Sequence, residues 1–410
     1  MRLPEMSDLT PDPARFPPDA LLMFRTDWDG IIQTASPTFL RTVGYTEEEV
    51  IGQSVRMFRH ADMPQAVYYY SSFALFEGRP VGAYTKSAAK DGADYWSFAI
   101  ATPVDGGVFS IQMNPRAEIL REVVPIYRDI CAGERAGTLS VEDSARALEA
   151  AIRARLNLRD YDAYMSYALS RECRKRDLSK GRAAPPQMRQ LREIYEMTLD
   201  VAARAAEVDA VFRETAQIRY NMRLQAGRLE GRFGPIGVIS ENHKVMRVKI
   251  EQDMRVFRDS AALGSDQIAH AAFATAVRGL ADELVETIRA DPRAQVDAAK
   301  WAVQDLQFLS EKYAARLADA LSRLKRNAAS LHEQCRRMRR VVSGLELTRI
   351  MCKIERARVY AGGEGLDEIV QRLERAERDL TLALSSIEKT VKSATSIADQ
   401  LSEKRRTVLV

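Results

Sequence analysis

Residues 81–113, VGAYTKSAAKDGADYWSFAIATPVDGGVFSIQM, decide the fold of the N-terminal part of the chain. Asp-Gly pairs at 91–92 and 105–106 interrupt three runs that favour extended structure. An Asp-Gly pair between such runs is a strong short-range signal for a β-hairpin. Every second residue from Trp96 to Ile100 is large and apolar, so one face of the middle run is apolar. The predicted strands are Val81–Ser87, Asp94–Pro103 and Val108–Met113.

The residues before this segment predict two further strands and the helices that follow them. Leu21–Phe24 and Ile31–Gln33 flank a polar turn at Asp27–Gly30, a pattern that indicates a hairpin. The Thr-x-x-Glu spacing at 46–49 is that of a capping box, so a short helix is expected to begin there. A longer helix is expected over Met63–Phe76. This order predicts an α+β domain, a five-stranded antiparallel sheet with helices on one face.

After Arg116 the sequence consists almost entirely of helix-forming residues, so a mainly α-helical region follows. Its clearest interruption is Ser179–Pro186, which ends in two prolines that a helix interior would not tolerate. The predicted layout is a flexible tail over 1–20, the α+β domain over 21–116, a helical connector and linker over 117–186, a helical domain over 187–295, and a coiled-coil hairpin over 296–404.

Two heptad seams mark the last hundred residues. The first is Leu324, Ala328, Leu331, Cys335, Met338, Val342 and Leu345; the second is Leu380, Leu384, Ile387, Val391, Ala394, Ala398 and Leu401. Between them Leu347, Ile350, Ile354 and Ala357 continue the spacing two residues out of register, which we interpret as a turn or stutter. Two seams with a break between them predict an antiparallel hairpin. Such hairpins commonly pair into a four-helix bundle, which implies a homodimer.

The composition excludes several classes of protein. The 410 residues are 46% hydrophobic and 29% charged, with 61 basic and 57 acidic side chains. This mixed surface does not indicate nucleic-acid binding. No run of about 18 apolar residues predicts a membrane span, and the N-terminus lacks the features of a secretory signal, so a cytoplasmic protein is expected. The four cysteines are far apart, which favours reduced thiols over a disulfide framework or a metal site.

Several blocks of the N-terminal domain resemble the PAS domain of bacterial aerotaxis receptors over about residues 20–116. They are Gly44-Tyr45-Thr46, Glu48-Glu49-Val50-Ile51-Gly52-Gln53, Met57-Phe58-Arg59-His60-Ala61-Asp62-Met63-Pro64, Lys90-Asp91-Gly92, Tyr95-Trp96 and Ala101-Thr102-Pro103-Val104. The Arg-His-x-Asp-Met-Pro block is the most specific of them. The Gly-Tyr-Thr and Gly-Gln pieces are common to PAS domains in general.

The resemblance implies a cofactor, flavin adenine dinucleotide (FAD), and a role in reading the redox state of the cell. It assigns flavin contacts to Arg59, His60 and Asp62, and Trp96 is a fourth candidate. In the family a tryptophan linked to the flavin follows a Gly-x-Pro, whereas Val81 follows that motif here. The residue types alone also allow a local structural role. Arg59 could pair with Asp62, His60 could cap the next helix, and Trp96 could be a core residue.

The C-terminal hairpin resembles, more weakly, the signalling domain of methyl-accepting chemotaxis proteins. The blocks are Leu345-Glu346-Leu347-Thr348, Ile354-Glu355-Arg356-Ala357-Arg358 and Gly363-Glu364-x-Leu366. The resemblance implies a chemotaxis kinase and its coupling protein as partners. It would place the hairpin turn near Ser343-Gly344, a position that the change of heptad register favours. The glycines alone would instead place it at Gly362–Gly365.

These observations predict a signal-transduction receptor or adaptor that senses redox state, oxygen or a small ligand and relays it through a dimeric helical bundle. The alternative is a scaffold whose PAS domain senses nothing and only docks partners. An enzyme is not expected, because no histidine lies in a kinase phosphoacceptor context. In addition, Gly231–Gly234 lacks the Gly-Lys-Ser/Thr ending of a phosphate-binding loop.

Overall fold

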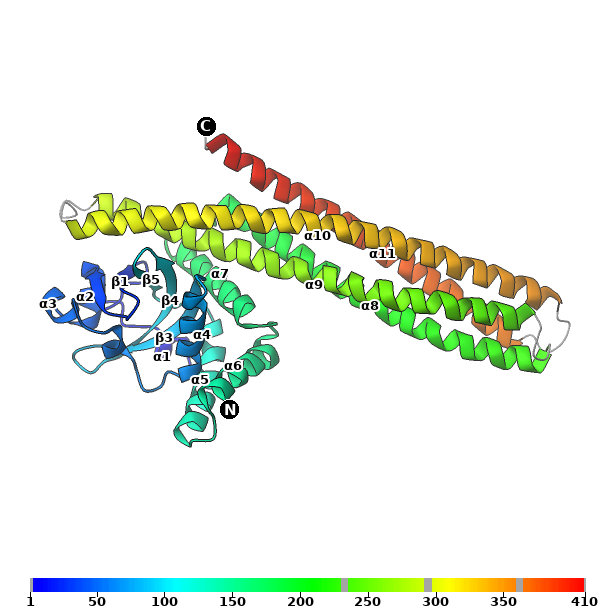
Figure 1. Ribbon diagram of the computed structural model, residues 1–410, viewed down its shortest axis with the longest axis horizontal. Coiled ribbons are helices and arrows are strands. Elements are labelled where there is room, and N and C mark those ends of the chain that lie inside the picture. Colours follow the sequence, from blue (N-terminus) through cyan, green and yellow to red (C-terminus); the bar gives the residue numbers. More distant parts are fainter. Residues whose placement is uncertain (1–2, 230–234, 291–296, 359–363, 409–410) are drawn as a thin grey trace. The chain divides into compact units, whose positions relative to one another are not determined.

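The computed structural model describes residues 3–229, 235–290, 297–358 and 364–408. Its contacts divide the chain into two compact units (Figure 1). The N-terminal unit comprises Met1–Arg189 and Ala269–Ala318, and the helical unit comprises Gln190–Ile268 and Asp319–Val410. This division differs from the predicted layout, because three long helices each contribute residues to both units.

Five strands form one antiparallel sheet in the order β2-β1-β5-β4-β3. Their bounds are β1 Leu21–Thr26, β2 Ile32–Ala35, β3 Val81–Ala88, β4 Asp94–Val104 and β5 Gly107–Met113. Both Asp-Gly turns form as predicted, since Gly92 and Gly106 adopt φ angles of 83° and 72°, which glycine takes without strain. A Cβ atom at Gly107 would collide with the Thr26 carbonyl oxygen, so the β1–β5 pairing also requires glycine there. The predicted five-stranded antiparallel sheet is confirmed.

Short helices lie over one face of the sheet, here called the inner face. They are α2 (Pro37–Val43), α3 (Glu47–Val50), the 3-10 turn η1 (Val55–Phe58) and α4 (Gln65–Phe76). Thr46 and Glu49 form the predicted capping box at the start of α3. Ser36 caps α2 by accepting a hydrogen bond from the Phe39 backbone N–H. An apolar cluster that includes Phe24, Phe39 and Phe58 fixes these elements on the sheet.

Residues 3–20 pack against this domain, in contrast to the flexible tail that we predicted over 1–20. They contain a helical turn, α1 (Met6–Leu9). The Phe16 ring is fully buried and meets the Tyr95 ring edge-on at 6.1 Å. The Asn114 side chain donates a hydrogen bond of 2.6 Å to the Phe16 carbonyl oxygen. Burial of one large aromatic side chain contributes about 2–3 kcal/mol, which anchors the segment.

The opposite, outer face of the sheet is covered by helices that follow it in the chain. Two of them are α5 (Ile119–Arg135) and α7 (Tyr161–Ser179), and α6 (Val141–Leu156) packs against α4 and α5. The hydroxyls of Thr102 on β4 and Tyr313 lie 2.8 Å apart. Gly82 on β3 leaves room for Phe98, Met165 and Phe273, which a Cβ atom there would touch at 3.1–3.4 Å. The outer face therefore belongs to a second, aromatic core.

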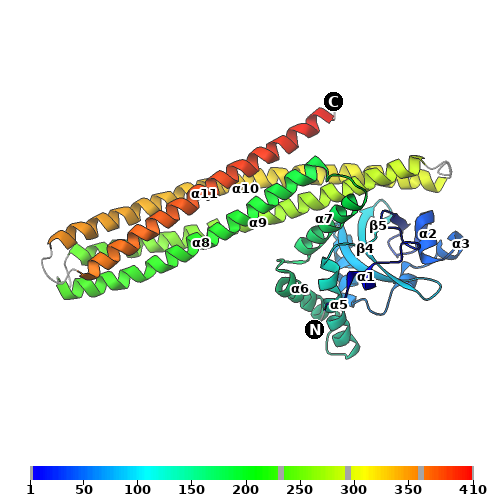
Figure 2. The same cartoon turned by 180° about the vertical axis from the view of Figure 1, so that it is seen from behind.

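The helical unit is a bundle of four long helices from one chain (Figure 2). They are α8 (Pro186–Leu229), α9 (Pro235–Ala290), α10 (Asp297–Arg358) and α11 (Glu364–Val408), of which the unit contains the parts within 190–268 and 319–410. Ion pairs join Arg339 to Glu388 at 2.7 Å and Arg356 to Asp367 at 2.9 Å, so α10 and α11 run antiparallel. The predicted antiparallel hairpin is confirmed.

The turn of this hairpin does not lie at Ser343-Gly344, and the prediction based on the chemotaxis-protein resemblance is wrong. Helix α10 runs without interruption through both residues to Arg358. Because α11 begins at Glu364, the connection falls within 359–363, which lie outside the described residues. The glycine-based placement agrees with these helix ends.

The expected change of heptad register on α10 is also absent. The buried seam continues from Leu345 through Thr348, Cys352 and Glu355, each at most 8% exposed. Leu347, Ile350 and Ile354 are 42–59% exposed and form a separate stripe on the surface of α10. The sequence suggests a change of heptad register because the seam contains the polar residues Thr348 and Glu355, while the exposed positions next to them are apolar.

The seam of the hairpin is covered within the same chain. Its buried residues, such as Leu331 and Leu384, share one apolar cluster with Val208 and Phe212 of α8 and Met254 of α9. A four-helix bundle is therefore complete without a second copy, and homodimerisation stays a prediction that needs another surface.

Phe16→Ala tests whether the N-terminal segment is anchored. We expect the substitution to lower the free energy of unfolding of the N-terminal unit by about 3–5 kcal/mol, because it removes a fully buried ring. The matched control is Phe76→Ala, which truncates a ring that is 92% exposed and should change stability by about 0.5 kcal/mol at most. Differential scanning calorimetry of both variants measures this, and equal effects would contradict the anchored segment.

Candidate functional site

The inner face of the sheet encloses a cavity of about 310 Å³. This volume lies at the lower end of the range of about 300–1,000 Å³ that is typical of small-molecule sites. Side chains from β1, β3, β4 and β5 line it on the sheet side, and η1 and α4 line it opposite. The cavity lies entirely within the N-terminal unit.

Side-chain alternation explains why this face is hollow. Successive residues of a strand point to opposite faces of a sheet. The inward positions on β3 and β4 include Ala83, Ala99 and Ala101, which line the cavity. The outward positions between them carry Tyr84, Phe98 and Ile100, which are at most 1% exposed. Small residues inward and large residues outward leave space on one face and fill the other.

Gln112 supplies an unpaired polar group at this cavity. It lines the cavity from β5 and is 7% exposed. Among the described residues its buried Oε1 atom has no hydrogen-bond partner. An unpaired buried acceptor costs about 1–3 kcal/mol, so the site fits a ligand that presents an N–H or O–H donor. Sequence reasoning missed Gln112, although its place between Ile111 and Met113 could have indicated the inner face.

Of the four predicted contact residues, Arg59 lines the cavity. Its guanidinium lies 3.8 Å from the centre of the Tyr68 ring, a cation–π contact with α4. The hypothesis that Arg59 pairs with Asp62 is not realised, because Lys86 binds Asp62 instead, at 3.0 Å. Desolvation lowers the pKa of Arg59. The side chain is placed to meet a polar group of a ligand.

His60 and Asp62 lie outside this cavity in a polar cluster with Lys86 and Asp94. The Lys86 ammonium contacts Asp94 at 2.6 Å as well as Asp62. The hydrogen bond from Lys86 holds the pKa of Asp62 below its usual value. His60 Nδ1 accepts the backbone N–H of Asp62 at 3.1 Å, so its side chain caps the turn before α4. Neither residue is among those that line the inner cavity.

Trp96 points to the outer face, where its ring lies 6.4 Å from that of Tyr127. It is 7% exposed and lines a second cavity, of about 410 Å³, together with Asp62 and Cys131. The structure thus separates the four predicted residues. Arg59 faces the inner cavity, Asp62 and Trp96 face the second one, and His60 links the two regions through the polar cluster.

Trp28, which sequence reasoning also missed, lies at the open end of the inner cavity. Its side chain is 58% exposed and still lines the cavity. It stands in the tight turn between β1 and β2, next to Asp27 and Asp29. A tryptophan in the middle of an Asp-Trp-Asp-Gly turn is the signal that could have revealed it, because turns rarely need a large ring.

Glu172 on α7 joins the outer face of the sheet to the residues that follow it. Its carboxylate accepts hydrogen bonds from the Tyr84 hydroxyl at 2.5 Å, the Arg116 N–H at 2.6 Å and the Ala117 N–H at 3.0 Å. The residue is 1% exposed. Burial raises the pKa of Glu172 to about 7, although these hydrogen bonds oppose the shift. The Glu172 carboxylate therefore connects helix α7 to strand β3 and to Arg116–Ala117, the segment by which the chain leaves β5.

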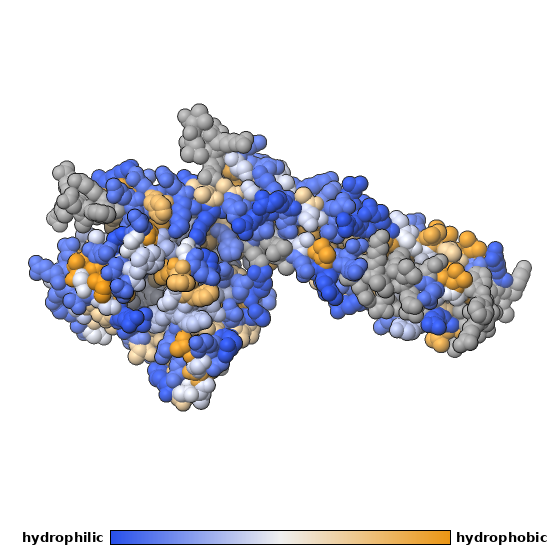
Figure 3. Space-filling model, in the orientation of Figure 1, coloured by the Kyte–Doolittle hydropathy of each residue, from blue (hydrophilic) through white to orange (hydrophobic). Residues whose placement is uncertain are grey.

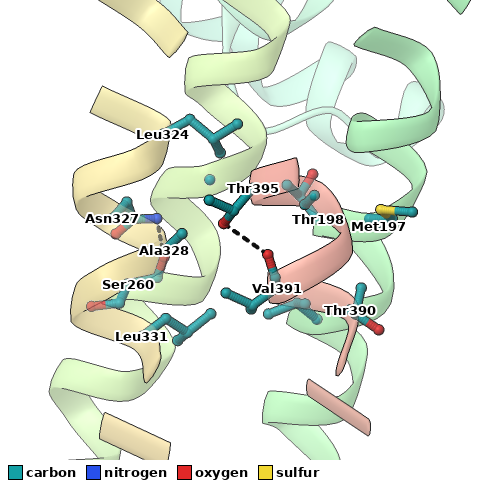
Figure 4. A pocket seen from close by; sticks show the side chains of 13 residues that line it. Met197, Thr198, Ser260, Leu324, Asn327, Ala328, Leu331, Thr390, Val391 and Thr395 are labelled. Carbon is teal, nitrogen blue, oxygen red and sulfur yellow. Dashed lines mark hydrogen bonds between the residues drawn. The ribbon is translucent and has the colours of Figure 1, made fainter. Parts of the chain in front are cut away.

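A third cavity lies in the helical unit and is much smaller, about 30 Å³ (Figure 4). Polar side chains line it, among them Thr198, Asn327 and Thr395. Asn327 donates a hydrogen bond of 2.7 Å to the Ser260 carbonyl oxygen. A space of this size holds one or two water molecules at most, so it is too small for a cofactor.

Comparison with known proteins places residues 32–113 in the PAS fold, whose family model they match. A region of 120 residues is 37% identical to the aerotaxis receptor of Escherichia coli (strain K12). The match covers 28% of this chain, and the chain spans about a quarter, 24%, of that receptor. The PAS domain is therefore shown, and the resemblance to aerotaxis receptors is confirmed for this part of the chain.

Solved structures match about a quarter of this chain. The LOV domain of the blue-light photoreceptor Aureochrome1 is 15% identical, with 27% of this chain and 86% of that chain covered and a TM-score of 0.24. A variant of Vivid is 20% identical over 24% and 81% of the two chains, with a TM-score of 0.21. A PAS domain from Colwellia psychrerythraea is 21% identical over 23% and 85%, with a TM-score of 0.20. Scores this low carry no functional argument.

Within the described ranges, no helix combines the length and the apolar composition that a membrane span needs.

The raised pKa of Glu172 predicts how stability depends on pH. Between about pH 4.5 and 7 the folded protein holds a proton on Glu172 that the unfolded chain has released, so the free energy of unfolding falls as pH rises. The total effect is about 3 kcal/mol. Glu172→Gln cannot ionise, and its profile should lack this fall. Urea unfolding at a series of pH values measures the difference, and parallel profiles would contradict the assignment.

Proposed function

We propose that the chain is a signal-transduction receptor whose PAS domain binds a flavin nucleotide, FAD, and reports redox state or oxygen. The observation that carries this proposal is the buried, unpaired acceptor of Gln112 in a cavity of about 310 Å³. The flavin ring has an edge N–H group that such an acceptor would bind. The identity with an aerotaxis receptor over 120 residues supports the proposal.

The residues present fit part of a flavin. Gln112 would hold the polar edge of the ring, and Arg59 would meet a polar group towards the opening. A bound flavin would supply a group whose charge and protonation depend on redox state. Val81 lines the cavity where the family has tryptophan, so it offers the ring an aliphatic contact and no aromatic one.

The outer face of the sheet is the proposed route of the signal. Tyr84 and Phe98 on this face touch each other at 5.0 Å between ring centres, and Tyr84 binds Glu172 on α7. Ala83 and Ala99, which alternate with them, line the cavity. A shift of the strands towards a ligand therefore changes contacts with α7 and with Tyr313 of α10. The switch would consist of two alternative packings of α7 and α10 against the sheet, and ligand binding would change their relative populations.

The exposed stripe of Leu347, Ile350 and Ile354 is the proposed docking surface for signalling partners. Figure 3 shows hydrophobic side chains gathered on the helical unit towards the end of α10. Apolar side chains grouped in this way mark interaction sites more often than single exposed residues do. A chemotaxis kinase and its coupling protein are the proposed partners, in a cytoplasmic homodimer without enzymatic activity of its own.

A scaffold that senses nothing is the second candidate. Val81 at the cavity favours it, as does the engagement of His60 and Asp62 in a polar cluster outside the cavity. In that case the cavity would bind no flavin, and substitutions inside it would leave partner docking unchanged.

Gln112→Leu tests the proposed flavin site. The full chain should bind FAD with the absorption bands of a flavin, and the variant should bind it about fivefold more weakly, because one buried hydrogen bond contributes about 1 kcal/mol. Gln53→Leu, which changes an exposed glutamine that does not line the cavity, is the matched control and should bind normally. Calorimetric titration gives the affinities. If the wild-type protein failed to bind FAD, FMN and riboflavin, the scaffold would be the better description.

A further inference from the structure

Trp28 stands on a turn whose backbone is held rigidly. The Asp27 side chain accepts hydrogen bonds from the backbone N–H groups of Asp29 at 3.0 Å and Ile31 at 2.8 Å. The Asp27 backbone N–H in turn donates to the Ile31 carbonyl oxygen at 3.0 Å. The Val55 backbone N–H, in η1, donates to the Gly30 carbonyl oxygen at 2.9 Å. The turn therefore presents Trp28 at a fixed position with respect to η1 and the cavity.

An exposed indole at this position stabilises the folded protein little. More than half of its surface, 58%, stays in contact with water, so most of its hydrophobic contribution is not realised. The side chain nevertheless lines the same cavity as the buried, unpaired Gln112. A large, rigid ring on a fixed turn at a cavity opening gains most of its contacts when a ligand fills the opening.

The register of the sheet gives the length of this site. Thr26, two residues before Trp28, pairs with Val108 on β5, whereas Gln112 pairs with Leu22 at the other end of β1. Four residues along a strand span about 13 Å. A ligand that reaches from Gln112 to Trp28 is therefore elongated, and its inner end carries a hydrogen-bond donor.

Charge contributes little to the selection of this ligand. The acidic residues Asp27 and Asp29 and the basic residues Arg56, Arg59 and Lys86 line the cavity. Lys86 is paired with Asp62 and Asp94, and the formal charges of the other four cancel. The selective contacts are the ring of Trp28 and the acceptor of Gln112, which together suit a flat aromatic ring system with one polar edge.

We infer that Trp28 is a positioning residue that packs against the flavin ring at the open end of the cavity, opposite Gln112. This inference rests on the proposed function and deepens it, because it supplies an aromatic contact from the β1–β2 turn. The contact excludes water from the ring and fixes which end of the ring faces outward.

Trp28→Ala in the full chain tests the inference with riboflavin and FAD as probes. We expect both to bind about tenfold more weakly, since the variant loses the aromatic contact as well as the area that the ring buries. Trp28→Phe should retain most of the affinity. Phe76→Ala, which truncates an exposed ring that does not line the cavity, is the matched control and should bind as the wild type does.

A second measurement reads Trp28 directly. Hydroxyl-radical footprinting of the wild-type protein should show that riboflavin protects Trp28 from oxidation. Unchanged affinity and oxidation would overturn the inference while the flavin site stands. A loss of affinity for FAD alone would place Trp28 on the adenine and also overturn it. A wild-type chain that binds neither probe would remove the proposed function and this inference together.

Discussion

The two faces of the PAS sheet have opposite packing requirements, and the rest of the N-terminal unit depends on this difference. Inward positions such as Ala83 and Ala99 are small, so the short helices close over a cavity. Outward positions such as Tyr84 and Phe98 are large and fully buried, so they need a second layer of helices. Because both sets alternate along the same strands, the cavity and the helical layer cannot be altered independently. A ligand that changes the spacing or twist of the strands acts on both faces.

The buried carboxylate of Glu172 makes this coupling specific. Apolar packing on the outer face tolerates small sliding movements, whereas hydrogen bonds to Tyr84, Arg116 and Ala117 do not. A buried carboxylate that lost them would keep its desolvation cost without compensation. Glu172 thus favours discrete arrangements of α7 on the sheet. Glu172 also accepts the backbone N–H groups of Arg116 and Ala117, just after β5 ends. Arg116 is only four residues after the cavity residue Gln112, so the ligand site and this contact are close along the chain.

Much of the fold could be predicted from local sequence signals. The Asp-Gly turns, the capping box at 46–49 and the heptad seams each act within a few residues, and the structure contains all of them. The anchored Phe16 could not be predicted, because it depends on a long-range contact with Tyr95. Thr348 and Glu355 concealed the continuous seam of α10, since burial of a polar residue depends on its partners and not on its type.

The candidate site was only partly predictable for the same reason. The motif at Arg59 indicated a contact residue, and Arg59 does line the cavity. The motif could not show that Trp96 faces the other side of the sheet, since the facing of a strand is set by its register. Gln112, Trp28 and Glu172 belong to no motif, and their importance follows from burial and neighbours alone.

The central claim is that a ligand in the inner cavity changes the contacts of Glu172 on the outer face, through the segment Arg116–Ala117 that follows β5. Hydrogen–deuterium exchange of the full chain with and without FAD tests it most directly, in the peptides that contain Arg116–Ala117 and α7. The account predicts that FAD changes protection of both peptides as well as of β5. Protection that changes around the cavity but stays the same at Arg116–Ala117 and α7 would contradict it.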